Sequence, residues 1–196
     1  MVKSGCFGEL RSELARKSLH MLIAMVPGLA AISFSDTALL LMIGTLFYAW
    51  AESMRFLGFS LPVISPVTAA VLRKREQGRF ALGPITLGLG ALLSLLIFPP
   101  KVAAAAIYAL AFGDSAAGFV GRFLGRLRPA FLAGKSIEGS LACLVVAFLA
   151  GFMVFEEWKI ALAVGIGSML ADALPIKDFD NLLLPLTAGL FSLAFM

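Results

Sequence analysis

Residues Ile137–Phe155 read IEGSLACLVVAFLAGFMVF, a run of 19 residues in which Glu138 is the only charged side chain. A helix needs roughly 20 apolar residues to cross a bilayer, so this stretch predicts a transmembrane helix. The whole chain agrees, because 60% of its 196 residues are hydrophobic and 14% are charged, whereas soluble domains carry about 25% charged residues. The chain is therefore predicted to be an integral membrane protein.

Six further apolar segments are long enough to count as spans. The seven predicted spans cover residues 19–34, 37–54, 82–98, 102–120, 137–155, 158–175 and 182–196. The segment over residues 61–72 is apolar but contains Pro62 and Pro66, and its short length favours an interfacial or re-entrant piece. The predicted fold class is all-α: a polytopic membrane helical bundle with about seven transmembrane helices and no separate soluble domain.

The distribution of basic residues predicts the orientation of this bundle. A cytoplasmic N-terminus places the connections over residues 55–79, 122–135 and 177–181 inside, and leaves outside only Lys101 and Lys159 of the 16 lysines and arginines. This bias obeys the positive-inside rule. The basic residues behind the net charge of +4 are then expected to contact lipid head groups, and no nucleic-acid partner is expected.

Two features of the chain predict little chemistry. The N-terminal basic residues resemble the start of a signal peptide, but no convincing cleavage site follows Pro27, so the segment is expected to be retained. Cys6 and Cys143 are the two cysteines, one near the N-terminus and one in an apolar run, so a disulfide is not expected.

Ionisable side chains inside or beside the spans are the first functional candidates, because they cost free energy unless they face a polar cavity. They gather on the predicted cytoplasmic side and comprise Glu52, Arg55, Asp114, Glu138 and Asp172. Glu52 and Arg55 are also spaced for an internal ion pair at i, i+3, and Asp172 for a solvated helix end. The small residues Gly113, Ala117 and Gly121 around Asp114 favour helix packing, but packing alone does not require a carboxylate.

The connection after Asp114 has the residue types of an anion site. Gly121, Arg122, Lys135 and Ser136 combine donors for phosphate oxygens with a glycine that permits close backbone approach, and Ser136 is placed to cap the next helix. Basic loops beside membranes look similar whatever their role. Together with the upstream carboxylate, however, the pattern predicts phosphate held by cations and by Mg²⁺ or a similar divalent cation, with Asp114 and Glu138 as metal ligands.

Two further clusters flank these motifs. His20, the only histidine, follows Arg16 and Lys17 at the entry to the membrane, where phosphate binding and head-group anchoring are both open. Asp180 and Asn181 precede the last span, where a solvated loop and a ligand-orienting amide are both open.

These motifs, in this order along nearly the whole chain, resemble the polyprenol kinase family, which includes dolichol kinase, phytol kinase and CTP-dependent diacylglycerol kinases. The matching elements are Glu13-Leu14-Ala15-Arg16-Lys17-Ser18-Leu19-His20, Ala51-Glu52-Ser53-Met54-Arg55, Gly113-Asp114-Ser115-Ala116-Ala117-Gly118 with Gly121-Arg122, Lys135-Ser136-Ile137-Glu138-Gly139-Ser140, and Asp180-Asn181-Leu182-Leu183-Leu184-Pro185. The resemblance implies one catalytic domain over residues 1–196 that transfers the γ-phosphoryl group of CTP to a membrane lipid alcohol at the cytoplasmic face.

The resemblance also implies a role for each site residue. Asp114 would bind Mg²⁺ or help to activate the hydroxyl, Arg122 and Lys135 would hold triphosphate oxygens, and Glu138 and Asn181 would complete the site. Arg16 and Lys17 would guide phosphate at its rim. Asp172 stands where the family often has glutamate. Diacylglycerol, a polyprenol and phytol would each fit as the acceptor.

Two other classes of function stay open at this point. The Gly-Asp, Gly-Arg and Lys-Ser-x-Glu-Gly elements are also similar to those of CDP-diacylglycerol synthases, which use CTP to transfer a cytidylyl group to phosphatidate. Against this, their longer charged C-terminal signature is missing. A transporter or lipid-binding scaffold would need polar residues near the middle of the bilayer with access from both sides, whereas here they gather at one face.

Overall fold

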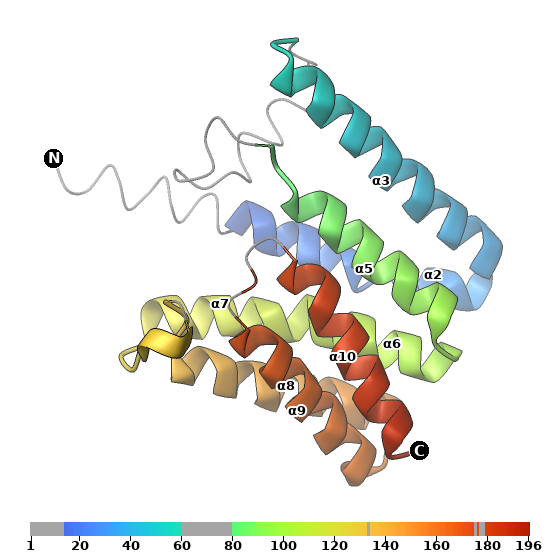
Figure 1. Cartoon of the computed structure of the whole chain (residues 1–196). Helices are drawn as coiled ribbons and strands as arrows, with labels where there is room; N and C mark the ends of the chain where they lie inside the picture. Colours follow the sequence, from blue (N-terminus) through green and yellow to red (C-terminus); the bar gives the residue numbers. More distant parts are fainter. Residues whose placement is uncertain (1–13, 60–79, 133, 175, 177–178) are drawn as a thin grey trace, which may run out of the picture.

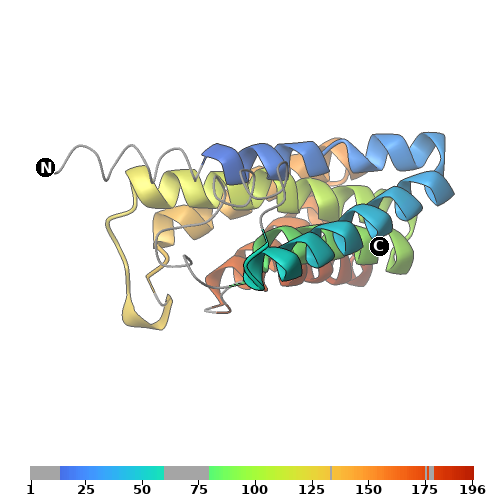
Figure 2. The same cartoon turned by 90° about the horizontal axis from the view of Figure 1, so that it is seen from above.

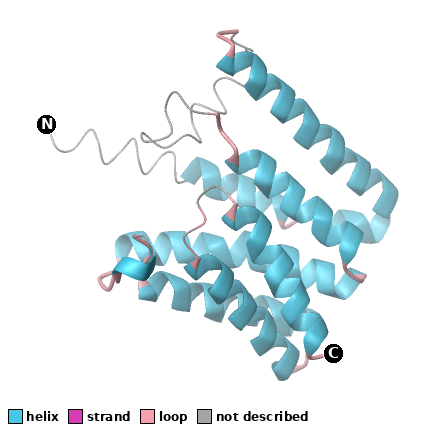
Figure 3. Cartoon of the chain, viewed as in Figure 1, coloured by secondary structure: helices cyan, strands magenta, loops and turns pink. Residues whose placement is uncertain are grey.

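A computed structural model describes residues 14–59, 80–132, 134–174, 176 and 179–196, and every regular element in these ranges is a helix (Figures 1 and 3). The predicted all-α class is therefore confirmed. After a first helix over residues 14–23, the elements are α2 (Val26–Ile32), α3 (Phe34–Phe56), α5 (Gly83–Ile97), α6 (Pro100–Tyr108), the π-helix η2 (Ala109–Gly113), α7 (Asp114–Phe123), the short 3-10 helix η3 (Ala130–Leu132), α8 (Ile137–Phe155), α9 (Trp158–Ala173) and α10 (Asp180–Ala194).

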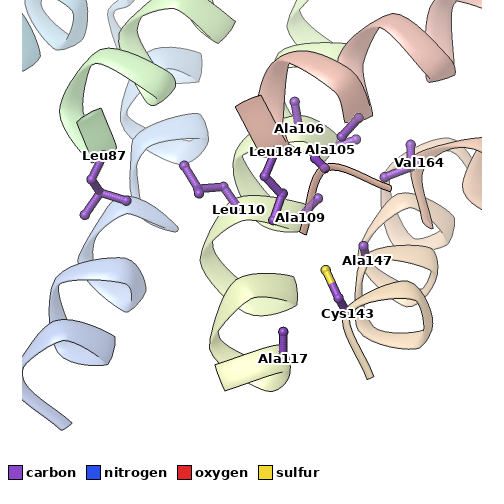
Figure 4. Close-up of a cluster of buried hydrophobic side chains, with 12 residues drawn as sticks. Leu87, Ala105, Ala106, Ala109, Leu110, Ala117, Cys143, Ala147, Val164 and Leu184 are labelled. Carbon is purple, nitrogen blue, oxygen red and sulfur yellow. The ribbon is translucent and has the colours of Figure 1, made fainter. Parts of the chain in front are cut away.

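One continuous helical stretch, Pro100–Phe123, forms the centre of the bundle. It joins α6, η2 and α7, and 67% of its most apolar window is buried inside the structure. Its buried face carries small residues, so α8, α9 and α10 approach it closely. Figure 4 shows Ala109 and Leu110 of this stretch packed among side chains from the surrounding helices.

Helix α3 lies at the edge of the bundle and packs on α2 and α5 (Figure 1). Only 11% of its apolar window is buried, and Leu40, Phe47 and Trp50 are exposed along it. Its 23 residues extend to about 34 Å, slightly more than the roughly 30 Å hydrocarbon core of a bilayer. A long helix with a bare apolar surface is suited to contact with lipid tails.

The described ranges contain three helices that are long and apolar enough to cross a membrane: Phe34–Phe56, Pro100–Phe123 and Ile137–Phe155. Helices Gly83–Ile97 and Asp180–Ala194 are apolar but shorter. The structure thus supports a membrane protein, while the count of seven spans and the cytoplasmic N-terminus stay predictions. The segment over residues 61–72, predicted as interfacial, lies outside the described residues.

The predicted span over residues 19–34 is divided in the structure. The first helix ends at residue 23, a turn follows, and α2 begins at Val26. Pro27 stands in the first turn of α2, where the backbone N–H that proline lacks would have no partner within the helix. In one uninterrupted helix, the same proline would remove a backbone hydrogen bond. Proline therefore breaks the predicted single helix into two shorter ones.

Glycines set the close approach of the helices that carry the charged residues. A Cβ atom on Gly139 of α8 would lie 2.9 Å from the carbonyl oxygen of Ala117 in α7, and one on Gly113 would lie 3.2 Å from Cys143 Sγ. The predicted packing through Gly113, Ala117 and Gly121 is therefore confirmed. This contact brings the start of α8 beside α7.

Candidate functional site

Two lysine–aspartate pairs dominate the polar end of the bundle, and both have the same geometry. Lys17 Nζ donates to the backbone oxygen of Asp114 at 2.8 Å and to Asp114 Oδ2 at 2.5 Å. Lys135 Nζ donates to the backbone oxygen of Asp172 at 2.5 Å and to Asp172 Oδ1 at 3.3 Å. Each ammonium group has three donors, so each lysine keeps one donor beyond its aspartate.

The pairs join segments that are far apart in the sequence. Figure 2 shows the helix over residues 14–23 alongside the central helix, and Lys17 reaches Asp114 across 97 residues of sequence. Lys135 stands in the connection before α8, and Asp172 near the end of α9. All four side chains are partly or fully shielded from solvent. Shielding strengthens these charge interactions relative to exposed ion pairs.

Asp180 connects the two pairs into one charged cluster. Its Oδ2 lies 3.8 Å from Lys135 Nζ, and its carboxylate is attracted by Arg16 and repelled by Asp114. We define the charged cluster as Arg16, Lys17, Asp114, Lys135, Asp172 and Asp180. It balances three cations against three carboxylates.

Apolar and small side chains lie beneath the charged cluster. Cys143 of α8 is fully buried and interacts electrostatically with both Asp114 and Asp172. Figure 4 places it beside Ala117 and Ala147. Ser140, one turn before Cys143 on the same helix, donates to Asp172 Oδ2 at 2.9 Å. Ser140 therefore holds the carboxylate that in turn holds Lys135.

Ser140, the last residue of the Lys135–Ser140 motif, was not among the predicted site residues. Its only signal in the sequence was its place in that motif.

Asp114 is contacted by two side chains of the first helix. Lys17 and His20 both approach Oδ2, the His20 Nδ1 atom at 3.3 Å, while Oδ1 has no hydrogen-bond or ion-pair partner among the described residues. The residue directly follows η2, and π-helical turns inside α-helices occur frequently at functional sites. The structure thus brings together three predicted site residues, Lys17, His20 and Asp114.

Side-chain hydrogen bonds to backbone groups hold the loop before α8 in place. Glu138 accepts hydrogen bonds from the backbone N–H groups of Arg126 at 2.9 Å and Leu127 at 3.1 Å. Arg128 donates to the carbonyl oxygens of Gly121 and Gly134 at 2.6 and 2.7 Å. Glu138 therefore holds the loop that carries Lys135. Nothing in the sequence pattern distinguished Arg128 from the other basic residues of this loop.

Ser136 and Gly121, both predicted to bind phosphate, contact each other. Ser136 Oγ accepts from the Gly139 N–H at 3.1 Å, which confirms the predicted cap of α8, and a Cβ on Gly121 would lie 3.0 Å from this Oγ. Arg122 is exposed in the last turn of α7, about 12 Å along the helix axis from Asp114. Among the described residues, Ser136 Oγ makes these contacts with Gly139 and Gly121 and not with a side chain of the charged cluster.

Glu52 and Asn181 tie neighbouring helices together at the start of α5. Glu52 is fully buried and accepts from Arg55 Nε at 2.7 Å, Arg55 Nη2 at 2.6 Å and the Ala81 N–H at 2.6 Å. The internal ion pair at i, i+3 is therefore present. Asn181 Nδ2 donates to the Gly83 carbonyl at 3.1 Å. Both side chains fix the chain that leads into α5.

Replacing Glu52 is expected to destabilise the fold. Glu52→Leu would leave the Ala81 N–H and the Arg55 guanidinium without their buried acceptor, at a cost of about 3 kcal/mol in the free energy of unfolding. Glu52→Gln keeps an oxygen for Ala81 and is expected to cost less. The melting temperatures of the wild type, Glu52→Gln and Glu52→Leu, measured in the same detergent, are expected to fall in that order. Equal melting temperatures for Glu52→Leu and the wild type would contradict this anchoring role.

The two carboxylates predicted to bind Mg²⁺, Asp114 and Glu138, lie in different surroundings. Glu138 is bound to backbone N–H groups, and no group of three His, Cys, Asp or Glu side chains in the described residues is arranged to hold a metal ion. Mg²⁺ is usually bound by one or two carboxylates together with substrate phosphates. Asp114, whose Oδ1 has no partner among the described residues, and Asp180 fit that requirement for a cation that arrives with a nucleotide.

Comparison with known proteins gives one informative similarity. No protein-family model and no solved structure matches the chain. A CTP-dependent diacylglycerol kinase 1 from Eremothecium gossypii is 35% identical over 83 residues, which cover 42% of this chain and 26% of that protein. The chain thus matches about a quarter of the length of this curated relative. Over that segment, the chain is similar to a kinase of the family that its motifs resemble.

Proposed function

We propose that this protein is a membrane-embedded kinase that transfers the γ-phosphoryl group of CTP to the hydroxyl group of a membrane lipid alcohol. The observation that carries the proposal is the charged cluster, in which two lysines are each oriented by one aspartate at the polar end of an apolar bundle. The similarity to a CTP-dependent diacylglycerol kinase supports the nucleotide and the class of acceptor.

The lysines would bind the triphosphate. Lys17 and Lys135 each keep one ammonium N–H beyond their aspartates, and these donors would bind phosphate oxygens, with Arg16 adding charge at the rim. Catalysis of phosphoryl transfer rests mainly on positioning and on neutralising charge. Ser140 and Asp172 would contribute by holding Lys135 in one direction.

In the proposed step, the hydroxyl oxygen of the lipid forms a bond to the γ-phosphorus. The bond between that phosphorus and the β,γ-bridging oxygen breaks, CDP leaves, and the hydroxyl proton is released to water. Mg²⁺, when bound with the nucleotide, supplies charge neutralisation on the phosphate oxygens, and Asp114 and Asp180 would hold it. We propose that residues 1–196 act as one catalytic unit, with the site at the cytoplasmic face where CTP is available.

The test uses two labels on CTP. Purified protein in detergent with Mg²⁺ receives CTP labelled either at the γ-phosphate or at the base, together with diacylglycerol, a polyprenol, phytol or phosphatidate. Diacylglycerol is the first acceptor to try, because the similar protein is named for it. We expect the γ-label, and not the base label, to appear on one lipid alcohol while CDP is released.

Each alternative function has its own result in this assay. Base label on phosphatidate would identify a cytidylyltransferase and contradict the kinase proposal. If neither label moves with folded protein, the enzyme proposal is wrong, and transport or lipid binding becomes the next hypothesis.

A further inference from the structure

His20 is buried beside the charged cluster, and one of its ring nitrogens has no hydrogen-bond partner among the described residues. Only 3% of the residue is exposed, and Nδ1 makes no hydrogen bond in the described part of the structure. The Nδ1 atom lies 3.3 Å from Asp114 Oδ2, but the contact does not have the direction of a hydrogen bond. An unpaired buried polar atom costs free energy, so its presence at this position needs an explanation.

Among the described residues, none donates a hydrogen bond to His20 Nδ1. Lys17, one turn earlier on the same helix, directs its ammonium group to the backbone oxygen and Oδ2 of Asp114. The imidazole also lies near the backbone carbonyl of Leu110 in η2, which is an acceptor. Asp114 offers only acceptor oxygens when ionised. When Nδ1 is the ring nitrogen without a proton, the described residues offer it no hydrogen-bond donor, and the hydroxyl group of a ligand can supply one.

The surroundings of His20 favour an amphipathic ligand. Leu19 and Ile23, on either side of His20 in the first helix, are partly buried against the apolar core. Asp114, which faces His20, stands in a helix long and apolar enough to span a membrane. A lipid alcohol combines an apolar body for such walls with one hydroxyl donor.

We infer that His20 Nδ1 accepts a hydrogen bond from the hydroxyl group of the lipid acceptor and so orients its oxygen beside Asp114. This inference rests on the proposed kinase function and assigns the acceptor end of the same site. The hydroxyl hydrogen points to Nδ1, which leaves the oxygen lone pairs directed at the γ-phosphate. The poor alignment with Asp114 is consistent with this role, because such contacts are often long or misdirected before substrate binds.

A matched pair of variants tests the position of the accepting atom. The side-chain amide of His20→Asn places an oxygen near the site of Nδ1, whereas that of His20→Gln reaches toward the site of Nε2. We expect His20→Gln to lose about tenfold to a hundredfold in kcat/KM for the alcohol, with the dissociation constant for CTP unchanged. His20→Asn is expected to retain kcat/KM within about threefold of the wild type.

A spectroscopic readout on the native sequence is independent of any variant. His20 is the only histidine, so ¹⁵N-histidine labelling gives signals from this ring alone. The acceptor chosen by the labelled-CTP assay is added without nucleotide, as dioctanoylglycerol for a glycerolipid kinase or farnesol for an isoprenoid kinase. The matched lipid with hydrogen in place of the hydroxyl is the control. We expect the Nδ1 signal to shift with the alcohol and not with its deoxy analogue.

Failure of this inference can be separated from failure of the kinase proposal. If the wild type transfers the γ-label but the Nδ1 signal shifts equally with both lipids, or not at all, His20 does not bind the hydroxyl. Retention of wild-type kcat/KM in His20→Gln would overturn the inference as well, and so would loss of CTP binding in both variants, which would show a structural role. If the wild type moves no γ-label, the kinase proposal itself is wrong.

Discussion

Asp114→Asn is expected to reduce γ-phosphoryl transfer by at least about a hundredfold. The substitution keeps the shape of the side chain and the backbone oxygen that Lys17 contacts, but it removes the negative charge that pairs with Lys17 Nζ. It also weakens Oδ1, the oxygen available to a nucleotide-bound Mg²⁺. The measurement is the initial rate of label transfer from γ-labelled CTP at saturating lipid.

Two controls separate loss of chemistry from loss of fold in this experiment. Asp36→Asn changes an exposed carboxylate at the start of α3, outside the charged cluster, and is expected to keep full activity. Because Asp114→Asn leaves the partly buried Lys17 without its counter-charge, a double variant with Lys17→Gln should recover stability while staying inactive. Asp114→Asn protein that keeps more than a tenth of the wild-type rate would remove Asp114 from the catalytic site.

Lys135→Ala is expected to lower kcat/KM for CTP by about a hundredfold. The truncated side chain can no longer bring a donor to the phosphate oxygens, and Asp172 and Asp180 lose the cation that lies between them. Rates measured over a range of CTP concentrations at fixed lipid give the change. The effect should fall mainly on CTP, because the lysine is assigned to the nucleotide and not to the alcohol.

The matched control for Lys135→Ala is Lys101→Ala at the exposed start of α6. Its kcat/KM should equal that of the wild type. Similar kinetics for the two alanine variants would show that Lys135 has no part in binding the nucleotide. The comparison also corrects for any general effect of removing one positive charge beside the membrane.

The sequence predicted correctly those features that depend on residues only a few positions apart. The apolar run Ile137–Phe155 forms one helix with the predicted bounds, and Ser136 caps it, because both features depend on residues a few positions apart. The Glu52–Arg55 pair was readable as an ion pair for the same reason. Pro27 was visible too, but a hydropathy window does not register the break that it causes.

Contacts between residues that are far apart in the sequence could not be predicted from such local patterns. Glu138 and Lys135 belong to one short motif, yet Glu138 binds the loop backbone while Lys135 reaches α9. Lys135 lies in the connection before α8 and Glu138 in the first turn of α8, and the position of α9 places Asp172 within reach of Lys135. The buried third contact of Glu52, to Ala81, likewise depends on where the chain returns to α3.

The sequence by itself therefore determined the class of the molecule and the candidate residues. Composition and the length of apolar runs decide that the chain forms apolar helices suited to a membrane, because the free energy of burying apolar surface is nearly additive along the chain. Only the tertiary structure decided which charges meet. Lys17 of the first helix pairs with Asp114, 97 residues later, and His20 Nδ1 has no hydrogen-bond partner among the described residues. Small residues such as Gly139 and Ala117 bring α8 close to the helix that carries Asp114, because they leave room for close contact between helices.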